Sequence, residues 1–309
     1  MQTALKSLLL RQHYTLIGKH SGLKICDWTK KALRGQDVCY KAKFYGIASH
    51  RCVQMSPALN RCAANCLHCW RELDFNAGMA LDETDEPETI IEGCLAAQAA
   101  KLSGFWGAPQ IEGRLLAEAK RPAHFAISLT GEPTIYPRLP ELVDELRARG
   151  LTSFVVSNGL FPERLAALTP TQLYLSAIAP DRALFEKLAR PRIGGAWSRI
   201  CESVAILAEL GRKTRTVLRL TLMRGLNDKP ESYVEMVETA RPRFIEVKAY
   251  MAVGAARLGY EHTPSHTEVR AFARVLAEKS GYRLANEKVN SRVVLLIKPG
   301  LRNALLEQA

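Results

Sequence analysis

The stretch "RCVQMSPALNRCAANCLHCWRE", residues 51–72, joins a short β-type run to a loop that carries three cysteines. Cys62, Cys66 and Cys69 lie four and three residues apart. Structural zinc sites usually have four protein ligands, and a 4Fe-4S cluster has four irons to bind. Three thiols on one loop therefore indicate either a fourth ligand from elsewhere in the chain or a metal with one open position.

Outside this stretch the sequence predicts a parallel α/β fold. After residue 50, short β-type runs alternate with helical segments, which is typical of βα units around a parallel sheet. The predicted strands are 51–56, 124–128, 153–157, 173–177, 216–223 and 244–251. The predicted helices lie near 86–101, 138–149, 181–189, 197–210, 229–239 and 265–279. Six strands favour an open, incomplete (β/α)6 TIM-like barrel over a closed barrel of eight strands.

Two regions are expected. Residues 1–49 form a basic, cysteine-bearing N-terminal extension that packs on the barrel, and residues 50–309 form the partial barrel with C-terminal edge elements. The tail "VNSRVVLLIKP", residues 289–299, is predicted to add an edge strand. In parallel barrels the catalytic groups lie on loops that follow the C-terminal ends of strands. The cysteine loop follows the first strand, so we expect it at the barrel mouth.

The 309-residue chain is basic, with 43 Lys and Arg against 31 Asp and Glu and a net charge of +12. Its first 50 residues hold nine of the basic residues and only two acidic ones. Such a surface attracts a phosphate backbone, although a well-solvated basic protein has the same composition. Charge thus suggests a nucleic-acid partner without identifying it.

The chain shows no apolar run of about 18 residues and no signal-peptide pattern, so we expect a cytoplasmic protein that does not enter a membrane. Disulfides are uncommon in that compartment. The eight cysteines therefore indicate metal binding, catalysis or packing.

The C-x3-C-x2-C loop after the first strand of such a barrel resembles the signature of the radical S-adenosylmethionine (SAM) superfamily. The resemblance implies that Cys62, Cys66 and Cys69 bind a 4Fe-4S cluster whose fourth iron chelates SAM. It also implies reductive cleavage of SAM to a 5′-deoxyadenosyl radical. His68 matches the aromatic position that lies against the adenine. The alternatives are a zinc loop completed by His68 or a distant ligand, and buried free thiols.

Residues at the ends of other strands match this reading. "LTGEPT", residues 129–134, resembles the Gly-Gly-Glu segment that binds the SAM amino group, with Thr130 in place of the first glycine. Taken singly, such residues are typical of turns and caps, but their shared place at strand ends favours cofactor binding. The candidates are Gly131, Glu132, Ser157, Asn158, Ser176 and Asn227.

A second set of cysteines precedes the loop. Cys26, Cys39 and Cys52 are separated by twelve residues each. The surrounding text, with "KLARPRIGGAW" (187–197), "RLTLMRGLND" (219–228) and "FIEVKAYMAVG" (244–254), resembles the archaeal tRNA 4-demethylwyosine synthases nearly end to end. That resemblance implies a second, auxiliary 4Fe-4S cluster with an open iron.

Pyruvate would chelate that open iron through its carboxylate and keto oxygens. The alternative for this triad is a structural cluster or zinc site with no substrate role. The two remaining cysteines, Cys94 and Cys201, fall in apolar helical segments and are predicted to be core thiols.

The family's reaction joins two carbons of pyruvate to N1-methylguanosine, the base 3′ to the anticodon of phenylalanine tRNA, and forms the tricyclic base 4-demethylwyosine. The N1-methyl group is unactivated, so abstraction of its hydrogen requires a strong radical. Ring closure requires an electrophilic carbonyl near a group that transfers protons, and a lysine can serve as Schiff-base partner or acid/base.

Two lysines are candidates for this role. Lys41 lies two residues after Cys39, beside the second cluster, and we rank it first. Lys248 lies in the sixth strand, with Glu246 two residues before it on the same face. The alternatives are a phosphate-binding or solvated Lys41, and a Lys248 that is ion-paired with Glu246 or a neighbouring strand.

The target base must leave its stack to enter a barrel mouth. Trp197 is a candidate for stacking on a nucleotide, or else a core anchor. The candidate phosphate contacts are the N-terminal extension and Arg190, Arg192, Arg215 and Arg224. The eukaryotic relatives carry a flavodoxin-like domain for which this chain is too short. We therefore expect a separate electron donor, such as flavodoxin or ferredoxin, and a monomeric enzyme.

Two rival functions are considered. One is a radical SAM enzyme that acts on a protein or small molecule, with the second cluster transferring electrons. The other is an RNA-binding protein with two structural metal sites and no catalysis.

Overall fold

A computed structural model describes residues 3–108 and 110–306 of the chain. The chain divides into two compact units, the first formed by residues 1–61 and 77–155 and the second by 62–76 and 156–309. The cysteine loop at 62–76 thus belongs to the second unit, although it lies within the sequence of the first.

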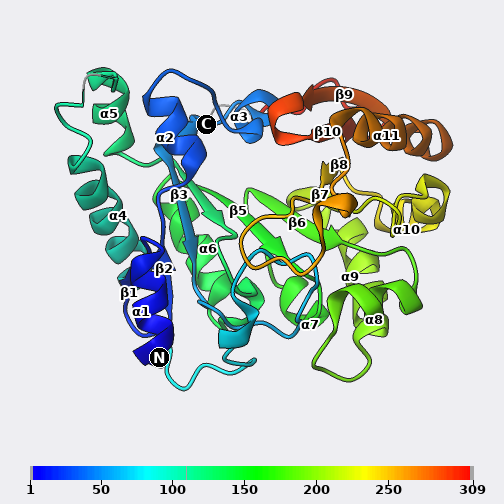
Figure 1. Cartoon of the computed structure of the whole chain (residues 1–309), viewed down its shortest axis with the longest axis horizontal. Helices are drawn as coiled ribbons and strands as arrows, with labels where there is room; N and C mark the ends of the chain where they lie inside the picture. The colour runs from blue at the N-terminus through cyan, green and yellow to red at the C-terminus, as the bar shows by residue number, and fades with distance from the viewer. Residues whose placement is uncertain (1–2, 109, 307–309) are drawn as a thin grey trace. The chain divides into compact units, whose positions relative to one another are not determined.

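The first unit contains strands in the order β1-β2-β3-β4-β5 (Figure 1). β1, β2 and β3 pair antiparallel, whereas β3, β4 and β5 pair parallel. Its elements are α1 (Thr3–Arg11), β1 (Thr15–Ile17), β2 (Ser21–Leu23), α2 (Asp27–Leu33), α3 (Tyr40–Tyr45), η1 (Ser49–Arg51), β3 (Cys52–Ser56), α4 (Pro87–Ser103), α5 (Gly113–Ala119), β4 (His124–Ile127), η3 (Pro133–Ile135), α6 (Leu139–Ala148) and β5 (Thr152–Ser157), whose last residues belong to the second unit.

The second unit contains strands in the order β6-β7-β8-β10-β9. β6, β7 and β8 pair parallel, and β10 pairs antiparallel with both β8 and β9. Its elements are η2 (Leu73–Phe75), α7 (Pro162–Leu165), β6 (Gln172–Ala177), α8 (Arg182–Ala189), α9 (Ala196–Leu210), β7 (Arg215–Leu222), η4 (Pro230–Tyr233), α10 (Val234–Ala240), β8 (Phe244–Ala249), η5 (Tyr260–His262), α11 (His266–Ser280), β9 (Arg283–Lys288), η6 (Val289–Ser291) and β10 (Val293–Ile297).

Local sequence explains these elements. β6 and β8 are buried along almost their whole length, which is typical of parallel strands covered on both faces. α11 begins with a capping box in which Ser265 and Glu268 each bind the other's backbone N–H, and it ends at Gly281 in the left-handed conformation.

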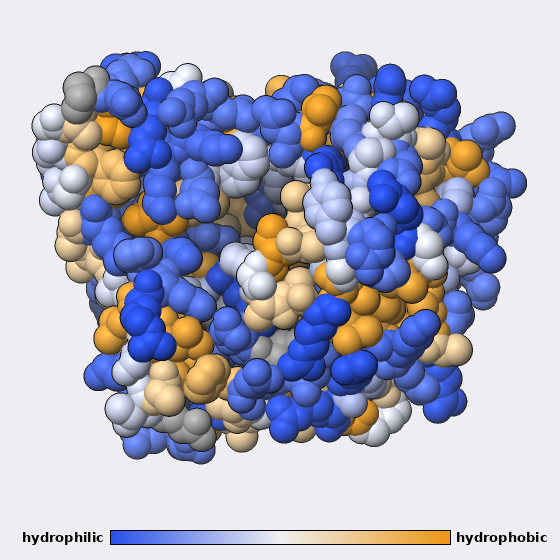
Figure 2. Space-filling model, viewed as in Figure 1, coloured by the Kyte–Doolittle hydropathy of each residue, from blue (hydrophilic) through white to orange (hydrophobic). Residues whose placement is uncertain are grey.

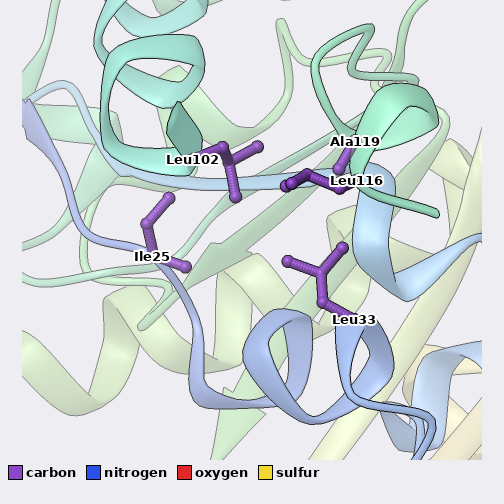
Figure 3. Packing of buried hydrophobic residues seen from close by; sticks show 5 residues of the cluster. All are labelled: Ile25, Leu33, Leu102, Leu116 and Ala119. Atoms are coloured by element: carbon purple, nitrogen blue, oxygen red, sulfur yellow. The ribbon is translucent and has the colours of Figure 1, made fainter. Parts of the chain in front are cut away.

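A small apolar cluster in the first unit fixes the segment that carries Cys26 (Figure 3). Ile25 precedes that cysteine and Leu33 ends α2, and both side chains are buried against α4 and α5. Full burial of such a side chain contributes about 1.5–3 kcal/mol. The members of the cluster are Ile25, Leu33, Leu102, Leu116 and Ala119.

All six predicted strands and six predicted helical regions are confirmed within a few residues. The tail forms strand β10 as predicted, but its predicted edge position is wrong, because β10 pairs with both β8 and β9. The prediction did not include α1, the β1–β2 hairpin, α2, α3, α5, α7 or β9. Residues 1–49 share their unit with residues 77–155, and their assignment as an extension stays a prediction. Among the described residues no helix is both long and apolar enough to span a membrane.

Candidate functional site

Backbone hydrogen bonds hold the cysteine loop, 62–76, on one side against the end of α8. The N–H of Asn65 donates to the carbonyl of Ala189 at 3.0 Å, and the N–H of Arg192 donates to the carbonyl of Ala63 at 2.8 Å. These bonds form a short β-like bridge. These backbone contacts fix the N-terminal part of the loop against α8.

The other side of the loop is held by the segment that follows β8. The N–H of Ala255 donates to the carbonyl of Trp70 at 3.1 Å, and that of Arg257 donates to the carbonyl of Leu67 at 2.9 Å. Gly254 has φ of 62°, and a Cβ there would lie 2.4 Å from the Trp70 carbonyl oxygen. Only glycine permits this approach.

Polar groups surround the thiols of the loop, which are partly buried and free of disulfides. Asn158 Nδ2 donates to the Cys62 sulfur at 3.4 Å, and Asn76 Oδ1 accepts the Cys62 N–H at 3.2 Å. Burial raises the pKa of Cys69, while the backbone N–H and charge of Arg71 oppose that rise. Donors and cations of this kind favour the thiolate, the form that binds iron.

His68 lies in the same loop with its ring held neutral. Burial lowers the pKa of His68 to about 4. Its Nδ1 is buried and has no hydrogen-bond partner among the described residues. A neutral, flat ring with a free nitrogen suits the predicted contact with an adenine, which stays a prediction.

The candidate segment after β4 folds back on the residues that lead into the cysteine loop. Gly131 has φ of 72°, and a Cβ there would lie 2.0 Å from the carbonyl oxygen of Ala58. The N–H of Glu132 donates to the carbonyl of Arg61 at 2.7 Å. The buried Glu132 carboxylate accepts from the N–H and hydroxyl of Thr134 at 3.2 and 2.7 Å. Its position follows the prediction, and its role toward SAM is untested.

The other strand-end candidates lie in the second unit. Ser157 Oγ accepts the N–H of Gly159 at 3.0 Å, and Ser176 is half-buried near the end of β6. Asn227 Oδ1 accepts the N–H of Met223 at 2.6 Å, and its Nδ2 donates to two backbone carbonyls at 2.8 Å. Both amide hydrogens of Asn227 are used within the protein, so this residue acts as a cap in the structure, and a ligand role stays a prediction.

The second triad lies in the first unit at the start of three elements. Cys26 precedes α2, Cys39 precedes α3, and Cys52 opens β3. Ser49 connects these segments: its Oγ accepts the N–H of Cys39 at 2.9 Å, and its carbonyl accepts the Thr29 hydroxyl at 3.1 Å.

His124 fixes the same region from β4. Its Nε2 accepts the N–H of Ala48 at 3.1 Å, and its Nδ1 lies 2.6 Å from Thr152 Oγ1. Burial lowers the pKa of His124 to about 4, so the ring is neutral and can accept that N–H.

Electrostatic coupling places the second triad's thiols near one another. The pKa of Cys52 is raised to about 12, mainly by burial; the charge of Lys41 opposes this rise, and Cys26 and Cys39 add to it. The pKa of Cys26 is raised first by burial and then by Cys39. The three cysteines and Lys41 therefore form one local group.

A 4Fe-4S cluster and a zinc ion both stay candidates at the two triads. Within the part of the chain that the structure describes, no three His, Cys, Asp or Glu side chains converge as ligands of one metal ion. A zinc ion needs its ligands at one point, whereas a 4Fe-4S cluster takes each cysteine on a different iron, which spaces the thiolates more widely.

The two candidate lysines have different surroundings. Lys41 is buried, with 7% of its surface exposed, and its Nζ lies 4.8 Å from the ring centroid of Phe154. Lys248 is half-buried, and its Nζ donates to the carbonyl of Ser291 at 3.4 Å. Of the two, Lys41 lies with the second triad.

Glu246, expected on the face of Lys248, is paired with an arginine of the neighbouring strand. Arg219 Nε and Nη2 both lie 3.0 Å from Glu246 Oε2, and Glu246 is fully buried. The Arg219 guanidinium also lies 4.3 Å from the ring centroid of Tyr174. The three side chains form a polar layer across β6, β7 and β8.

Two known families match the chain. The family described as "Radical SAM superfamily" matches residues 57–237, and "Wyosine base formation" matches residues 239–298. The S-adenosyl-L-methionine-dependent tRNA 4-demethylwyosine synthase of Pyrococcus abyssi is 43% identical over 308 residues, which cover 96% of this chain and 90% of the relative. The enzyme of the same name from Methanocaldococcus jannaschii is 39% identical over 300 residues, which cover 94% of each chain.

The chain belongs to the tRNA 4-demethylwyosine synthase family of radical SAM enzymes.

Solved structures of this family share the fold. "Structure of TYW1 with a lysine-pyruvate adduct bound" has a TM-score of 0.90 and 36% identity, and the match covers 99% of both chains. "Crystal structure of archaeal TYW1" has a TM-score of 0.82 and 33% identity, and the match covers 99% of this chain and 100% of that one. The predicted partial radical SAM barrel is thereby confirmed.

The arginines predicted to bind phosphate fall into two groups. Arg190 and Arg192 are exposed beside the cysteine loop. By contrast, Arg215 donates to the carbonyl of Leu305, and Arg224 pairs with Glu268. The second group is used within the protein, and all four assignments stay predictions.

The surroundings of Trp197 match its alternative role as a core anchor. It is partly buried, and its ring centroid lies 5.7 Å from that of Phe185. This contact between α8 and α9 makes it a packing residue.

One of the two thiol predictions is wrong. Cys94 is buried as predicted, but Cys201 is exposed on α9. Ile200 and Val204, four residues apart, occupy the buried face of that helix. A residue one position along is rotated by about 100°, which turns Cys201 to solvent.

Several residues at the site were not predicted. Ser49, Thr29, His124 and Asn76 each hold a cysteine segment through a hydrogen bond. Their hydrogen-bond partners are mostly backbone groups that lie far away in the sequence. No pattern of residue spacing in the sequence predicts such contacts.

Proposed function

We propose that this radical SAM enzyme condenses N1-methylguanosine in phenylalanine tRNA with pyruvate to form 4-demethylwyosine. The observation that carries this proposal is the buried Lys41 among the second triad of cysteines. Support also comes from the names of the relatives and from a related structure described as holding a lysine-pyruvate adduct.

The cysteine loop would hold the SAM-binding 4Fe-4S cluster through Cys62, Cys66 and Cys69. Such a cluster supplies the electron that cleaves SAM. Asn158 supports this role by donating to the Cys62 sulfur. His68 would place its neutral ring against the adenine, while Glu132 would attract the SAM ammonium.

The second triad would hold an auxiliary 4Fe-4S cluster through Cys26, Cys39 and Cys52. Lys41 would bind pyruvate there: its neutral amine adds to the keto carbon, and loss of water gives the Schiff base. Burial against Phe154 supports this assignment because it excludes water and limits the positions of Nζ. Lys248 would serve as the alternative amine or as a proton-transfer group.

Two further parts of the proposal concern partners. The enzyme would work as a monomer, and a separate flavodoxin or ferredoxin would supply its electron. A basic chain with a net charge of +12 suits both an RNA substrate and an acidic electron carrier.

The test is an anaerobic assay with reconstituted enzyme, SAM, a reductant and tRNA carrying N1-methylguanosine, with and without pyruvate. Mass analysis of the nucleosides should find the tricyclic base only when pyruvate is present. Cys69→Ala should abolish SAM cleavage, whereas Cys201→Ala, at an exposed thiol, should leave it unchanged. SAM cleavage without any modified nucleoside would favour a protein or small-molecule substrate instead.

A further inference from the structure

Trp70 follows the third cysteine of the loop, yet its indole is exposed. The side chain keeps 46% of its surface accessible. The Arg71 guanidinium carbon lies 3.3 Å from its ring centroid and covers part of the indole. The Trp70 carbonyl accepts the N–H of Ala255 at 3.1 Å, which fixes the backbone that carries the ring.

Other exposed apolar side chains lie on the segment that contacts Trp70. Met251 and Val253 are 39% and 49% exposed, and both belong to the turn that leads into Gly254, which touches the Trp70 backbone. Most of the face shown in Figure 2 is hydrophilic, with apolar residues gathered in limited patches. A group of neighbouring exposed apolar side chains indicates a binding surface, whereas a single exposed apolar side chain does not.

Two exposed arginines flank the same loop on its other side. Arg190 and Arg192 border the bridge that joins the loop to the end of α8. In the described part of the chain, neither guanidinium has an ion-pair partner, whereas Arg182 in the preceding helix α8 pairs with Glu186. These two cations are therefore available to a negatively charged partner.

Resting on the function proposed above, we propose that Trp70, Arg190 and Arg192 bind the single-stranded loop of the RNA substrate. An unstacked base beside the one that is modified lies on the Trp70 indole, and the neighbouring phosphates contact the two arginines. Every base has a π-face, so an aromatic platform with nearby arginines suits single-stranded RNA. Arginine also binds phosphate through two N–H groups at once.

The base on Trp70 is a neighbour of the target because of where Trp70 lies. Its Cα is about 3.8 Å from that of Cys69, a proposed cluster ligand. The cysteine thiols are partly buried, whereas the indole is exposed. A base on the indole thus stays at the rim of the site while the modified base enters it.

The first test measures binding of an RNA stem-loop to the reconstituted holoenzyme. The loop carries 2-aminopurine next to N1-methylguanosine, so stacking quenches its fluorescence. Loss of base–aromatic stacking should raise Kd by about 5- to 150-fold in Trp70→Ala and remove the quenching. Trp70→Leu, which keeps apolar bulk without a π-face, should behave like Trp70→Ala, and Trp70→Phe should retain most of the affinity.

The matched control is Trp106→Ala in the first unit. Trp106 is 54% exposed and also has a cation over its ring, Lys120 at 4.9 Å. The Trp106→Ala variant should bind RNA with the affinity of the wild type. Wild-type affinity and quenching in both Trp70→Ala and Trp70→Leu would overturn the proposal.

The second test concerns the arginines. Arg190 has φ of 45°, so asparagine, which tolerates this conformation, replaces it. Arg190→Asn with Arg192→Gln should reduce the slope of log Kd against log salt by about 0.7 per residue, as for phosphates of a single strand. Arg182→Gln, which removes an already paired arginine, should leave the slope unchanged. An unaltered slope in the double variant would remove the arginines from the RNA surface.

The two proposals fail in different ways. Wild-type enzyme that forms the pyruvate-dependent tricyclic base, together with variants that bind RNA normally, would refute this surface and leave the function intact. Wild-type enzyme that forms no such base would refute the function, whatever the binding results.

Discussion

The backbone N–H of Cys39 donates to the hydroxyl oxygen of Ser49 at 2.9 Å. Ser49 is 3% exposed, and its carbonyl accepts the hydroxyl of Thr29. Thr29 lies three residues after Cys26, and Ser49 lies three before Cys52. One buried serine therefore connects the segments of all three cysteines in the second triad.

Ser49→Ala should weaken the second cluster selectively. It leaves the partly buried Cys39 N–H without this acceptor, which costs at most about 1–3 kcal/mol. We expect less iron per protein and a reduced signal from the second cluster, with SAM cleavage retained. Ser280→Ala, which removes a hydroxyl bonded to the Leu276 carbonyl of α11, should keep full iron. Equal iron content in the two variants would show that Ser49 does not position the triad.

Lys41→Ala should separate SAM cleavage from product formation. The change removes the proposed amine nucleophile but no cysteine, so both clusters and SAM cleavage should persist while the tricyclic base falls at least about 100-fold, in line with loss of a nucleophile. Lys41→Arg should not restore the base, because guanidinium keeps the charge and cannot form a Schiff base.

The comparison is Lys248→Ala, which removes a lysine bonded to the Ser291 carbonyl. It should lower product formation less than Lys41→Ala does. Near wild-type product from Lys41→Ala would move pyruvate binding from Lys41 to Lys248.

Glu246→Ala should destabilise the second unit strongly. It leaves Arg219, whose side chain is 15% exposed, without its buried carboxylate partner. Breaking a buried pair from one side costs about 3–5 kcal/mol. The measurement is urea-induced unfolding followed by circular dichroism. Glu186→Ala, at the exposed partner of Arg182, should lower the free energy of unfolding far less, because exposed ion pairs contribute little. A similar loss of unfolding free energy in Glu246→Ala and Glu186→Ala would show that the buried Arg219–Glu246 pair is no more important for stability than an exposed ion pair.

Acidification should destabilise the first unit through His20. Its Nδ1 lies 2.6 Å from the carbonyl of Pro57, and its Nε2 accepts the N–H of Asp85 at 2.9 Å. Burial lowers the pKa of His20 below its usual 6.5. The neutral ring is therefore the folded form. Its stabilising contribution is complete above about pH 6.5 and is lost as pH falls through the lower, folded-state pKa.

Thermal melting between pH 8 and 5 tests this prediction. His20→Gln, which keeps an acceptor and does not titrate, should show a smaller loss of melting temperature over that range. An identical loss in the wild type and in His20→Gln would assign the acid sensitivity to other groups.

The sequence predicted most of the barrel because its strands and longer helices have clear periodicity. The elements that it missed are short. α2 and α3 have seven and six residues, too few for a period of 3.6 to be read, and their stability comes from tertiary contacts such as that of Leu33. Cys201 was wrongly predicted to be a core thiol because its neighbours in sequence are apolar. In α9 those neighbours face the core, whereas the side chain of Cys201 faces solvent.

The placing of Cys62, Cys66 and Cys69 on one loop could be predicted because their spacing is local, whereas the residues that support the loop could not. Asn158 was predicted from its place after β5 as a cofactor-binding residue, which stays a prediction, and the structure shows in addition that it donates to the Cys62 sulfur. The contact of Ser49 with Cys39 joins two segments ten residues apart through a backbone N–H, which any residue carries. Such contacts depend on the folded chain rather than on residue type.

Isotopic labelling of pyruvate shows directly whether its keto and methyl carbons enter the tricyclic base. Enzyme, SAM, reductant and methylated tRNA are incubated anaerobically with pyruvate labelled with 13C either at the carboxylate carbon or at the keto and methyl carbons. If pyruvate condenses with N1-methylguanosine as proposed, the tricyclic base gains both labelled carbons from pyruvate labelled at the keto and methyl carbons. It gains no label from pyruvate labelled at the carboxylate carbon. A base with label from the carboxylate, or an unlabelled base in both cases, would contradict condensation of the N1-methyl carbon with pyruvate.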